Sequence, residues 1–338
     1  MPSPSLNCQP AAFGRALAHW FEANGRDYPW RRTHDPYAVL VSEIMLQQTQ
    51  IATVLERGYY ERWLKRFPNF ATLAKAAEPE VLKAWEGLGY YRRARFLHKL
   101  AQSVIADHGG VFPRDITAIR KLPGIGDYTA GAVVSFAFDD KQPIVDGNIA
   151  RVLSRIYNDA TPIDSTAGKK LLWQRAEILV SAAASARIHN SALMELGQTI
   201  CKPAQPACII CPIKKFCTAT DPAALPVKSK RTAITEVTER VYLLKTKEGV
   251  LLQQEVGARR TGLWKLPALE ETVKLPPLLH QCTYAITRYR VTLHVHSAPR
   301  LERSIPPLHH SIIPLSKLSE LPMPSPYRRA LAAALLEM

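Results

Sequence analysis

Four of the six cysteines in this 338-residue chain fall within seventeen residues, and this cluster constrains the fold more than any other feature. A disulfide framework is typical of small secreted domains, and we expect no secretion signal here. Zinc is usually held by two Cys-x2-Cys pairs, but only one such pair is present. Four thiolates on one short loop therefore suit a compact iron–sulfur cube better, with zinc or unligated thiols as the alternatives. The predicted ligands of a [4Fe-4S] cluster are Cys201, Cys208, Cys211 and Cys217.

The charge balance points to a polyanionic partner. Lysine and arginine number 44 against 29 aspartates and glutamates, a formal net charge of +15, and residues 1–225 and 226–338 are both basic. Nucleic acid is the leading candidate, and a merely soluble basic protein is the alternative. No run approaches the ~18 apolar residues of a membrane span. We expect a cytoplasmic protein, nucleoid-associated when bound to DNA, with no membrane partner and a monomeric state.

The period of the apolar residues changes along the chain. From residue 13 to about 200 they recur at three and four positions, as in helices, and beyond residue 236 they alternate, as in strands. The sequence thus predicts a mainly α domain over 1–217, a linker over 218–235 and a smaller α+β domain over 236–338. Within the second domain we expect strands at 241–244, 250–253 and 290–296 and a closing helix at 327–336.

Two local patterns in the first domain stand out. Asp35 and Pro36 predict a capped helix that runs through Ile51. Between helical stretches at 116–121 and from 127 onward, Gly124 and Gly126 permit a tight turn whose free backbone amides suit a phosphate. A plain connection between helices is the alternative reading of that turn.

Three elements in this order resemble the helix-hairpin-helix DNA glycosylases typified by endonuclease III: the turn at 122–126, the segment around Asp146 and the cysteine loop. The resemblance implies that the hairpin, with Gly124 and Gly126, grips the DNA backbone and that Asp146 is catalytic. Members that also cut the strand carry a lysine two residues after the last glycine, where this chain has Tyr128. Without that amine, we expect hydrolysis of the glycosidic bond and no strand cleavage.

Residues 42–50, Ser-Glu-Ile-Met-Leu-Gln-Gln-Thr-Gln, are similar to the signature of MutY-type adenine DNA glycosylases, which remove adenine mispaired with 8-oxoguanine. Adenine leaves poorly unless a ring nitrogen is protonated, so one carboxyl must hold a proton while another stays ionised. Glu43, on an apolar helix, suits the general acid. Asp146, at a helix N-terminus, suits the carboxylate that stabilises the oxocarbenium-like sugar. For either residue alone, a surface carboxylate or a helix cap is the plainer interpretation.

The same resemblance assigns residues to base extrusion and recognition. Gln48 is expected as the wedge in the gap, and Tyr90 beside the orphaned 8-oxoguanine. An ordinary core role is the alternative for Tyr90 and Trp30. The remaining assignments are Trp30, Arg31 and Glu195 at the adenine pocket, and Tyr128 and Asn148 around Asp146.

The second domain resembles a Nudix fold that has lost its metal site. Residues 241–244, 250–252 and 262–267 match its opening, but residues 226–338 contain no aspartate, so magnesium-dependent nucleotide hydrolysis is not expected. In MutY-type enzymes this domain reads 8-oxoguanine through a Phe-Ser-His loop. The nearest match here is Ile-Thr-Arg, in which Thr287 keeps a hydroxyl but the histidine is absent.

Together these features predict a monofunctional glycosylase that releases adenine from 8-oxoguanine:adenine or guanine:adenine mispairs in double-stranded DNA. Two alternatives stay open: a glycosylase that takes thymine from guanine mispairs, and an iron–sulfur DNA-binding module without catalysis.

Overall fold

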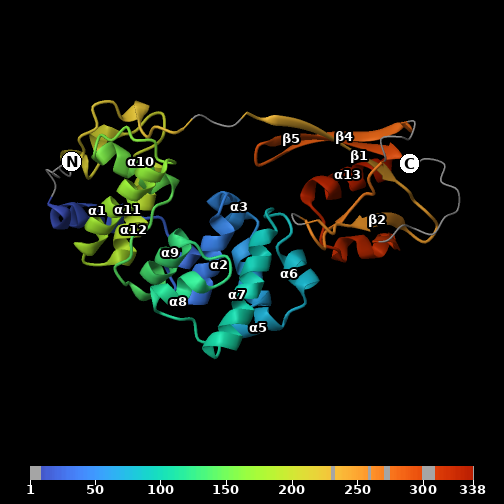
Figure 1. Cartoon of the computed structure of the whole chain (residues 1–338), viewed down its shortest axis with the longest axis horizontal. Coiled ribbons are helices and arrows are strands. Elements are labelled where there is room, and N and C mark those ends of the chain that lie inside the picture. Colours follow the sequence, from blue (N-terminus) through green and yellow to red (C-terminus); the bar gives the residue numbers. More distant parts are fainter. Residues whose placement is uncertain (1–8, 230–232, 258–259, 270–274, 299–308, 338) are drawn as a thin grey trace. The chain divides into compact units, whose positions relative to one another are not determined.

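The structure of the chain is a computed structural model that describes residues 9–229, 233–257, 260–269, 275–298 and 309–337 (Figure 1). By its internal contacts the chain forms two compact units. The first unit joins residues 1–48 to 103–231, and the second joins residues 49–102 to 232–338. Part of the helical region thus groups with the C-terminal segment, while the domain boundaries drawn from the sequence stay a prediction.

The first unit is built around a helical core. Apolar side chains of α1, α10, α11 and α12 meet there, among them Phe13, Leu153, Leu179 and Leu196. Helix α7 (Arg92–His108) belongs to both units. The other helices of the first unit are α1 (Pro10–Asn24), α2 (Pro36–Leu46), α8 (Ile116–Lys121), α9 (Asp127–Phe138), α10 (Gly147–Ile156), α11 (Thr166–Ser181) and α12 (Ala186–Thr199).

Helix α2 is apolar on every side and is therefore buried, packed beside α9. Asp35 caps it, because its side chain accepts from the backbone N–H groups of Tyr37 and Ala38. The prediction that this helix runs through Ile51 is wrong. Helix α2 ends at Leu46, and Gln48 adopts a left-handed backbone with φ of +57°, which no α-helix can contain.

In its described residues, the second unit combines helices with two three-stranded sheets. Strand β5 lies between β1, which is parallel to it, and β4, which is antiparallel; β2 lies between β3 and β6, both antiparallel. The helices are α3 (Ile51–Glu56), α4 (Tyr59–Arg66), α5 (Phe70–Lys75), α6 (Glu78–Ala84) and α13 (Ser325–Leu336). The strands are β1 (Thr235–Leu243), β2 (Val250–Gln254), β3 (Trp264–Lys265), β4 (Leu278–Ile286), β5 (Tyr289–Ser297) and β6 (His310–Ile313).

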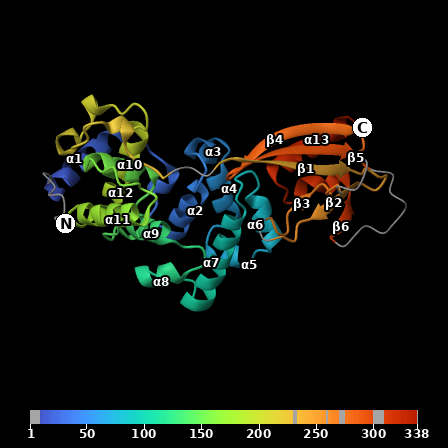
Figure 2. The ribbon, with the colours of Figure 1, turned by 45° about the horizontal axis from the view of Figure 1, so that its top comes forward.

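Helix α13 covers the sheet of β1, β5 and β4 (Figure 2). Leu243, Leu293, Val295, Tyr327 and Leu331 form the core between them. The predicted fold class is confirmed: a mainly α region is followed by a smaller α+β region, consistent with a Nudix-like domain. None of the helices in the described part of the chain is long and apolar enough to cross a bilayer.

Candidate active site

Two glycines let the segment that carries Asp146 lie close to its neighbours. A Cβ on Gly131 of α9 would stand 2.4 Å from the carbonyl oxygen of Pro143, and one on Gly197 of α12 would stand 2.7 Å from the Cβ of Asn148. Asp146 is the N-cap of α10, and its Oδ1 accepts from the N–H of Ile149 at 2.7 Å. The predicted catalytic carboxylate is therefore fixed by the start of its own helix.

Glu43 projects from the buried helix α2 and is itself buried. The hydroxyl of Tyr128 donates to its Oε2 at 2.9 Å. Burial raises the pKa of Glu43 to about 7, and the charge of Asp146 adds to the rise, while the bond from Tyr128 and the charge of Arg31 oppose it. Glu43 is thus a carboxylic acid poised to hold or release a proton near neutral pH.

Asp146 shares the site but has more hydrogen-bond donors. Burial raises its pKa as well, whereas the N–H of Ile149, the side chain of Asn148 and the charge of Arg151 lower it. Asn148 Nδ2 donates to Oδ2 at 3.0 Å. Because two anions at one buried site repel each other, a single proton is favoured, and the donors around Asp146 direct that proton to Glu43.

Arg151 connects this site to the cysteine loop. Its Nη2 donates to Asn148 Oδ1 at 2.9 Å, and its Nε donates to the carbonyl oxygen of Cys201 at 2.8 Å. One chain of hydrogen bonds therefore runs from Asp146 through Asn148 and Arg151 to the first cysteine.

A second buried carboxylate, Glu195 on α12, is held by two arginines. Arg26 Nε donates to one oxygen at 2.7 Å and Arg31 Nη1 to the other at 2.8 Å, and the Glu195 side chain is 0% exposed. The guanidinium of Arg31 also lies 4.8 Å from the ring centroid of Tyr28, on which the buried Trp30 stacks. Arg31, Glu195 and Trp30, predicted from the sequence to line the base pocket, thus form one connected group.

The hairpin between α8 and α9 presents exposed backbone. Gly124 has a φ of +78°, and Gly126 is the N-cap of α9, with open space where a Cβ would stand. An anion can reach the first amides of α9 there. Gln48 is likewise exposed, while Gln47 donates to Thr129 Oγ1 at 3.3 Å.

Tyr90 and Thr287 belong to the second unit. Tyr90 is 44% exposed with a φ of +47°, and Thr287 is exposed in the turn between β4 and β5 with a φ of +51°. Left-handed backbone at non-glycine residues is unfavourable by about 1 kcal/mol or more, and residues strained in this way are enriched at functional sites.

The four clustered cysteines line one cavity. Within the described ranges, no three histidine, cysteine, aspartate or glutamate side chains are spaced to hold a single metal ion. Arg155, almost fully buried, donates from Nη1 toward Cys201 Sγ at 3.2 Å and also to the carbonyl oxygens of Lys202 and Pro203. A positive charge facing four thiol groups around a cavity fits an anionic cluster held by thiolates.

Sequence reasoning missed three arginines of this site, namely Arg26, Arg151 and Arg155. The signal for Arg151 and Arg155 is their spacing of four among the apolar residues of α10, since a buried arginine requires partners. Arg26 has no comparable signal, because its partner Glu195 is 169 residues away.

Comparisons with known proteins agree with this geometry. Residues 41–177 match the model of the HhH-GPD superfamily of base excision DNA repair proteins. Among solved structures, the chain is similar to a thermostable thymine-DNA glycosylase, with a TM-score of 0.55 and 34% identity over 62% of this chain and 95% of that one. It also shares its fold with endonuclease III trapped covalently on DNA, with a TM-score of 0.51 and 23% identity over 64% of this chain and 97% of that one.

The chain is also similar in sequence to adenine DNA glycosylases from other organisms. The human adenine DNA glycosylase is 43% identical over 217 residues, which cover 62% of this chain and 39% of the human protein. The chain spans about two fifths of the length of this and the rodent relatives. The adenine DNA glycosylase of Buchnera aphidicola subsp. Baizongia pistaciae is 37% identical over 258 residues, which cover 75% of this chain and 71% of the relative. The chain therefore belongs to the adenine DNA glycosylase family, within the HhH-GPD superfamily.

Proposed function

We propose that this protein is a monofunctional DNA glycosylase that hydrolyses the N-glycosidic bond of adenine mispaired with 8-oxoguanine or guanine. The observation that carries the proposal is the pair of carboxyls at one site: Glu43 is buried and accepts from Tyr128, and the partly buried Asp146 accepts from Asn148 and Ile149. Burial raises the pKa of both groups, so one proton between them is favoured. Its substrate is double-stranded DNA, and the protein acts as a monomer in the cytoplasm, at the nucleoid.

The reaction follows from the different surroundings of the two carboxyls. Glu43 donates its proton to a ring nitrogen of an adenine extruded from the stack, and the electrons of the C1′–N9 bond leave with the base. The carboxylate of Asp146 stabilises the oxocarbenium-like sugar that remains. Water then adds to C1′ and gives its proton to Glu43, which restores the acid and leaves an abasic site.

Tyr128 and Asn148 position the two carboxyls. Each donates one hydrogen bond, Tyr128 to Glu43 and Asn148 to Asp146. Tyr128 occupies the position of the strand-cutting lysine and offers no amine for a Schiff base, so the product keeps an intact backbone. Arg31, Glu195 and Trp30 form the wall that receives the base.

We propose that Cys201, Cys208, Cys211 and Cys217 hold a [4Fe-4S] cluster. The four thiolates would hold the cluster and cross-link the loop to itself, while Arg151 and Arg155 connect the loop to α10. Arg155 donates toward the sulfur of Cys201 and offsets part of the negative charge.

DNA binding and lesion recognition are assigned to exposed backbone and side chains. Gly124 and Gly126 present amides to a phosphate, and Gln48 fills the gap left by the adenine. Tyr90 stacks beside the orphaned 8-oxoguanine, and the Thr287 hydroxyl hydrogen-bonds to it. The left-handed backbone of Gln48, Tyr90 and Thr287 supports these roles, because each side chain is displayed at a turn.

Release of thymine from guanine mispairs is the second candidate, favoured by the 34% identity to the solved thymine-DNA glycosylase. Thymine needs no protonation at an adenine-like ring nitrogen, so the proton held on Glu43 favours adenine.

Single-turnover incubation of end-labelled duplexes tests the proposal. Duplexes with 8-oxoguanine:adenine, guanine:adenine and guanine:thymine pairs are run with and without hot alkali. We expect cleavage of the adenine strand only after alkali, and none with Glu43→Gln, which still binds the duplex. Cleavage without alkali would contradict monofunctional chemistry. Cleavage of the thymine strand alone would establish the second candidate. The absence of cleavage in every duplex, together with retained binding, would indicate a DNA-binding module without catalysis.

The role of Thr287 is tested by the ratio of the rates on 8-oxoguanine:adenine and guanine:adenine. Thr287→Ala is expected to lower this preference about fivefold to tenfold, since one hydrogen bond to the lesion is lost. Thr287→Ser, which keeps the hydroxyl, is the matched control. An unchanged ratio in the alanine variant would place lesion recognition elsewhere.

A further inference from the structure

The loop between α6 and α7 has a tightly prescribed backbone. Gly87, Gly89 and Tyr90 have φ values of +99°, +71° and +47°. A Cβ on Gly87 would stand 1.9 Å from the hydroxyl oxygen of Tyr59, so the loop also approaches α4 closely. A left-handed conformation at Tyr90 persists only where the surrounding contacts determine it.

Contacts from the helical side hold the middle of the loop. Trp85 Nε1 donates to the carbonyl oxygen of Gly89 at 3.0 Å. Arg93 donates to the carbonyl oxygens of Leu88 and Gly89 at 3.0 and 3.2 Å, and its guanidinium lies 5.6 Å from the Tyr90 ring centroid. Backbone hydrogen bonds from Glu86 to Lys83 and from Arg95 to Tyr91 join the ends of the loop to α6 and α7, and the side chains of Glu86 and Tyr91 make further contacts.

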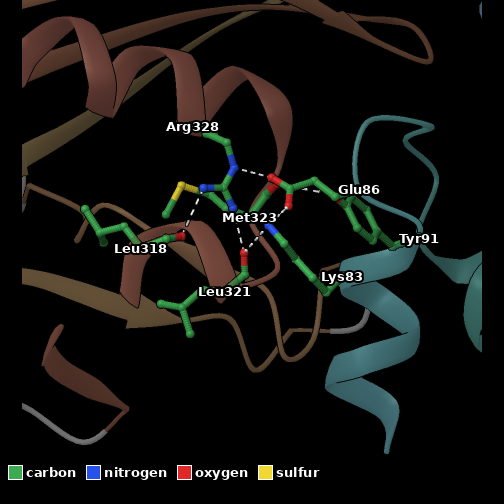
Figure 3. A network of polar contacts seen from close by, with 7 residues as sticks. All are labelled: Lys83, Glu86, Tyr91, Leu318, Leu321, Met323 and Arg328. Carbon is green, nitrogen blue, oxygen red and sulfur yellow. Dashed lines mark hydrogen bonds and ion pairs between the residues drawn. The ribbon is translucent and has the colours of Figure 1, made fainter. Parts of the chain in front are cut away.

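The C-terminal segment holds both ends, as Figure 3 shows. The carboxylate of Glu86 pairs with Arg328 of α13 and with Lys83. The hydroxyl of Tyr91 donates to the carbonyl oxygen of Met323 at 3.1 Å. Arg328 is itself oriented by the carbonyl oxygens of Leu318 and Leu321, to which it donates at 3.0 and 2.6 Å.

Burial strengthens this set of contacts. The side chains of Glu86 and Arg328 are 14% and 30% exposed, and Met323 and Tyr91 are buried. An ion pair partly removed from water is screened less than a surface pair, and removal of one partner leaves the other charge unpaired. Burial also raises the pKa of Tyr91, so its phenol stays protonated and keeps donating.

We propose that Glu86, Tyr91 and Arg328 form a clamp through which the C-terminal segment orders the loop and holds Tyr90 in its displayed conformation. Arg328 and Glu86 are then positioning residues for Tyr90. This inference rests on the proposed function, in which Tyr90 stacks beside the orphaned 8-oxoguanine. The C-terminal segment thus acts on the lesion in two ways, through Thr287 directly and through Tyr90 by means of the clamp.

Hydrogen–deuterium exchange of the full-length protein without DNA tests the ordering. We expect Arg328→Met and Glu86→Gln each to increase exchange of the peptide over residues 85–92 roughly tenfold, because local opening is no longer restrained. Arg329→Met is the matched control. Arg329 is the exposed neighbour of Arg328 on the same helix, and its substitution removes the same charge. Equal exchange in the Arg328 and Arg329 variants would overturn the clamp.

A mutant cycle with Tyr90→Ala tests the connection to Tyr90. On 8-oxoguanine:adenine duplexes, Arg328→Met should lower the single-turnover rate roughly threefold to tenfold when Tyr90 is present and less than twofold when it is alanine. Equal effects in both backgrounds would reduce Arg328 to a stabilising residue and overturn the proposal. Glu86→Gln repeats the cycle with a side chain of nearly the same shape, and circular dichroism checks that the variant is folded.

The two proposals fail in different ways. If the wild-type protein releases no adenine, the proposed function is wrong, and the exchange measurement still decides whether the clamp orders the loop. If the wild type is active and the Arg328 and Arg329 variants behave alike, the proposed function stands and the clamp is wrong.

Discussion

Glu43 carries a proton near neutral pH because its helix is buried on all sides and Asp146 stands nearby. With a pKa of about 7, its acid form is depleted as the pH rises. We therefore expect the single-turnover rate of adenine release to be level below pH ~6 and to fall about tenfold per unit above pH ~8. Tyr128→Phe removes a bond that stabilises the ionised form, so the fall should move to higher pH. An unshifted profile in that variant would contradict Glu43 as the group that titrates.

Loss of the Glu43 proton destabilises the folded protein at high pH, because the buried carboxyl must then carry a charge. Its pKa is higher in the folded than in the unfolded chain, so the unfolded state loses its proton first and the free energy of unfolding falls between pH 4.5 and about 7. A rise from 4.5 to about 7 corresponds to a loss of about 3 kcal/mol above that window. Glu43→Gln, which still accepts from Tyr128, should resist urea better than the wild type at pH ~8 and equally near pH ~4.5. A gain that is the same at both pH values would have another cause.

The packing of α10 against α12 depends on Gly197. A Cβ there would stand 2.7 Å from the Cβ of Asn148, and backbone atoms of Asn148 lie 3.3 Å away. Gly197→Ala is expected to lower the free energy of unfolding by about 1–3 kcal/mol and to reduce adenine release, because Asn148 is pushed from Asp146. Chemical denaturation and single-turnover kinetics measure the two effects. For stability, Gly147→Ala on α10 is the control, with open space around its Cβ. Equal stability of the two variants would contradict the packing argument.

Elements with strong local signals could be predicted from the sequence. The strands at 250–253 and 290–296 and the helix at 327–336 lie within β2, β5 and α13. The end of α2 could not be predicted, since glutamine is not a turn residue and nothing local marks Gln48 as left-handed. Strand β4 was missed although its half-buried Cys282, Tyr284 and Ile286 alternate with exposed residues. None of its residues is fully buried, so the alternation gives only a weak strand signal. Its pairing with β5 decides its conformation.

The candidate site shows the same division between local and distant information. Glu43 and Asp146 could be proposed because each stands in a local motif. Asn148 and Ile149, which donate to Asp146, follow it on the same helix. Tyr128, which donates to Glu43, comes from a different helix, 85 residues along the chain. Arg151 donates a hydrogen bond to Cys201, which lies 50 residues further along the chain. Arg155 donates to the same cysteine across 46 residues. A single sequence carries no trace of such pairings, since burial and partner are fixed only when α10 packs against the cysteine loop.

At the scale of the whole molecule, segments that lie far apart in the sequence group by their contacts. Residues 49–102 group with residues 232–338, although their helical pattern resembles that of the first unit. The expected linker is also tied down in part. The N–H of Ile163 donates to the carbonyl oxygen of Val227 at 3.0 Å, and Ser229 donates to Asp164 at 2.8 Å. Such backbone and side-chain bonds have no signature in composition, which is why the segment reads as solvated.

The net charge of +15 gives a prediction for the whole chain on DNA. Each phosphate neutralised by a basic side chain releases counterions, so affinity for an undamaged duplex should fall about 10³-fold or more between ~50 and ~200 mM salt if six or more phosphates are contacted. The preference for 8-oxoguanine:adenine should change far less, because base contacts carry it. Fluorescence anisotropy with the Glu43→Gln variant measures both affinities without turnover. An affinity that does not change with salt concentration would show that the surplus positive charge does not bind the DNA backbone. A preference for the lesion that is lost at high salt would assign lesion recognition to phosphate contacts instead of Tyr90 and Thr287.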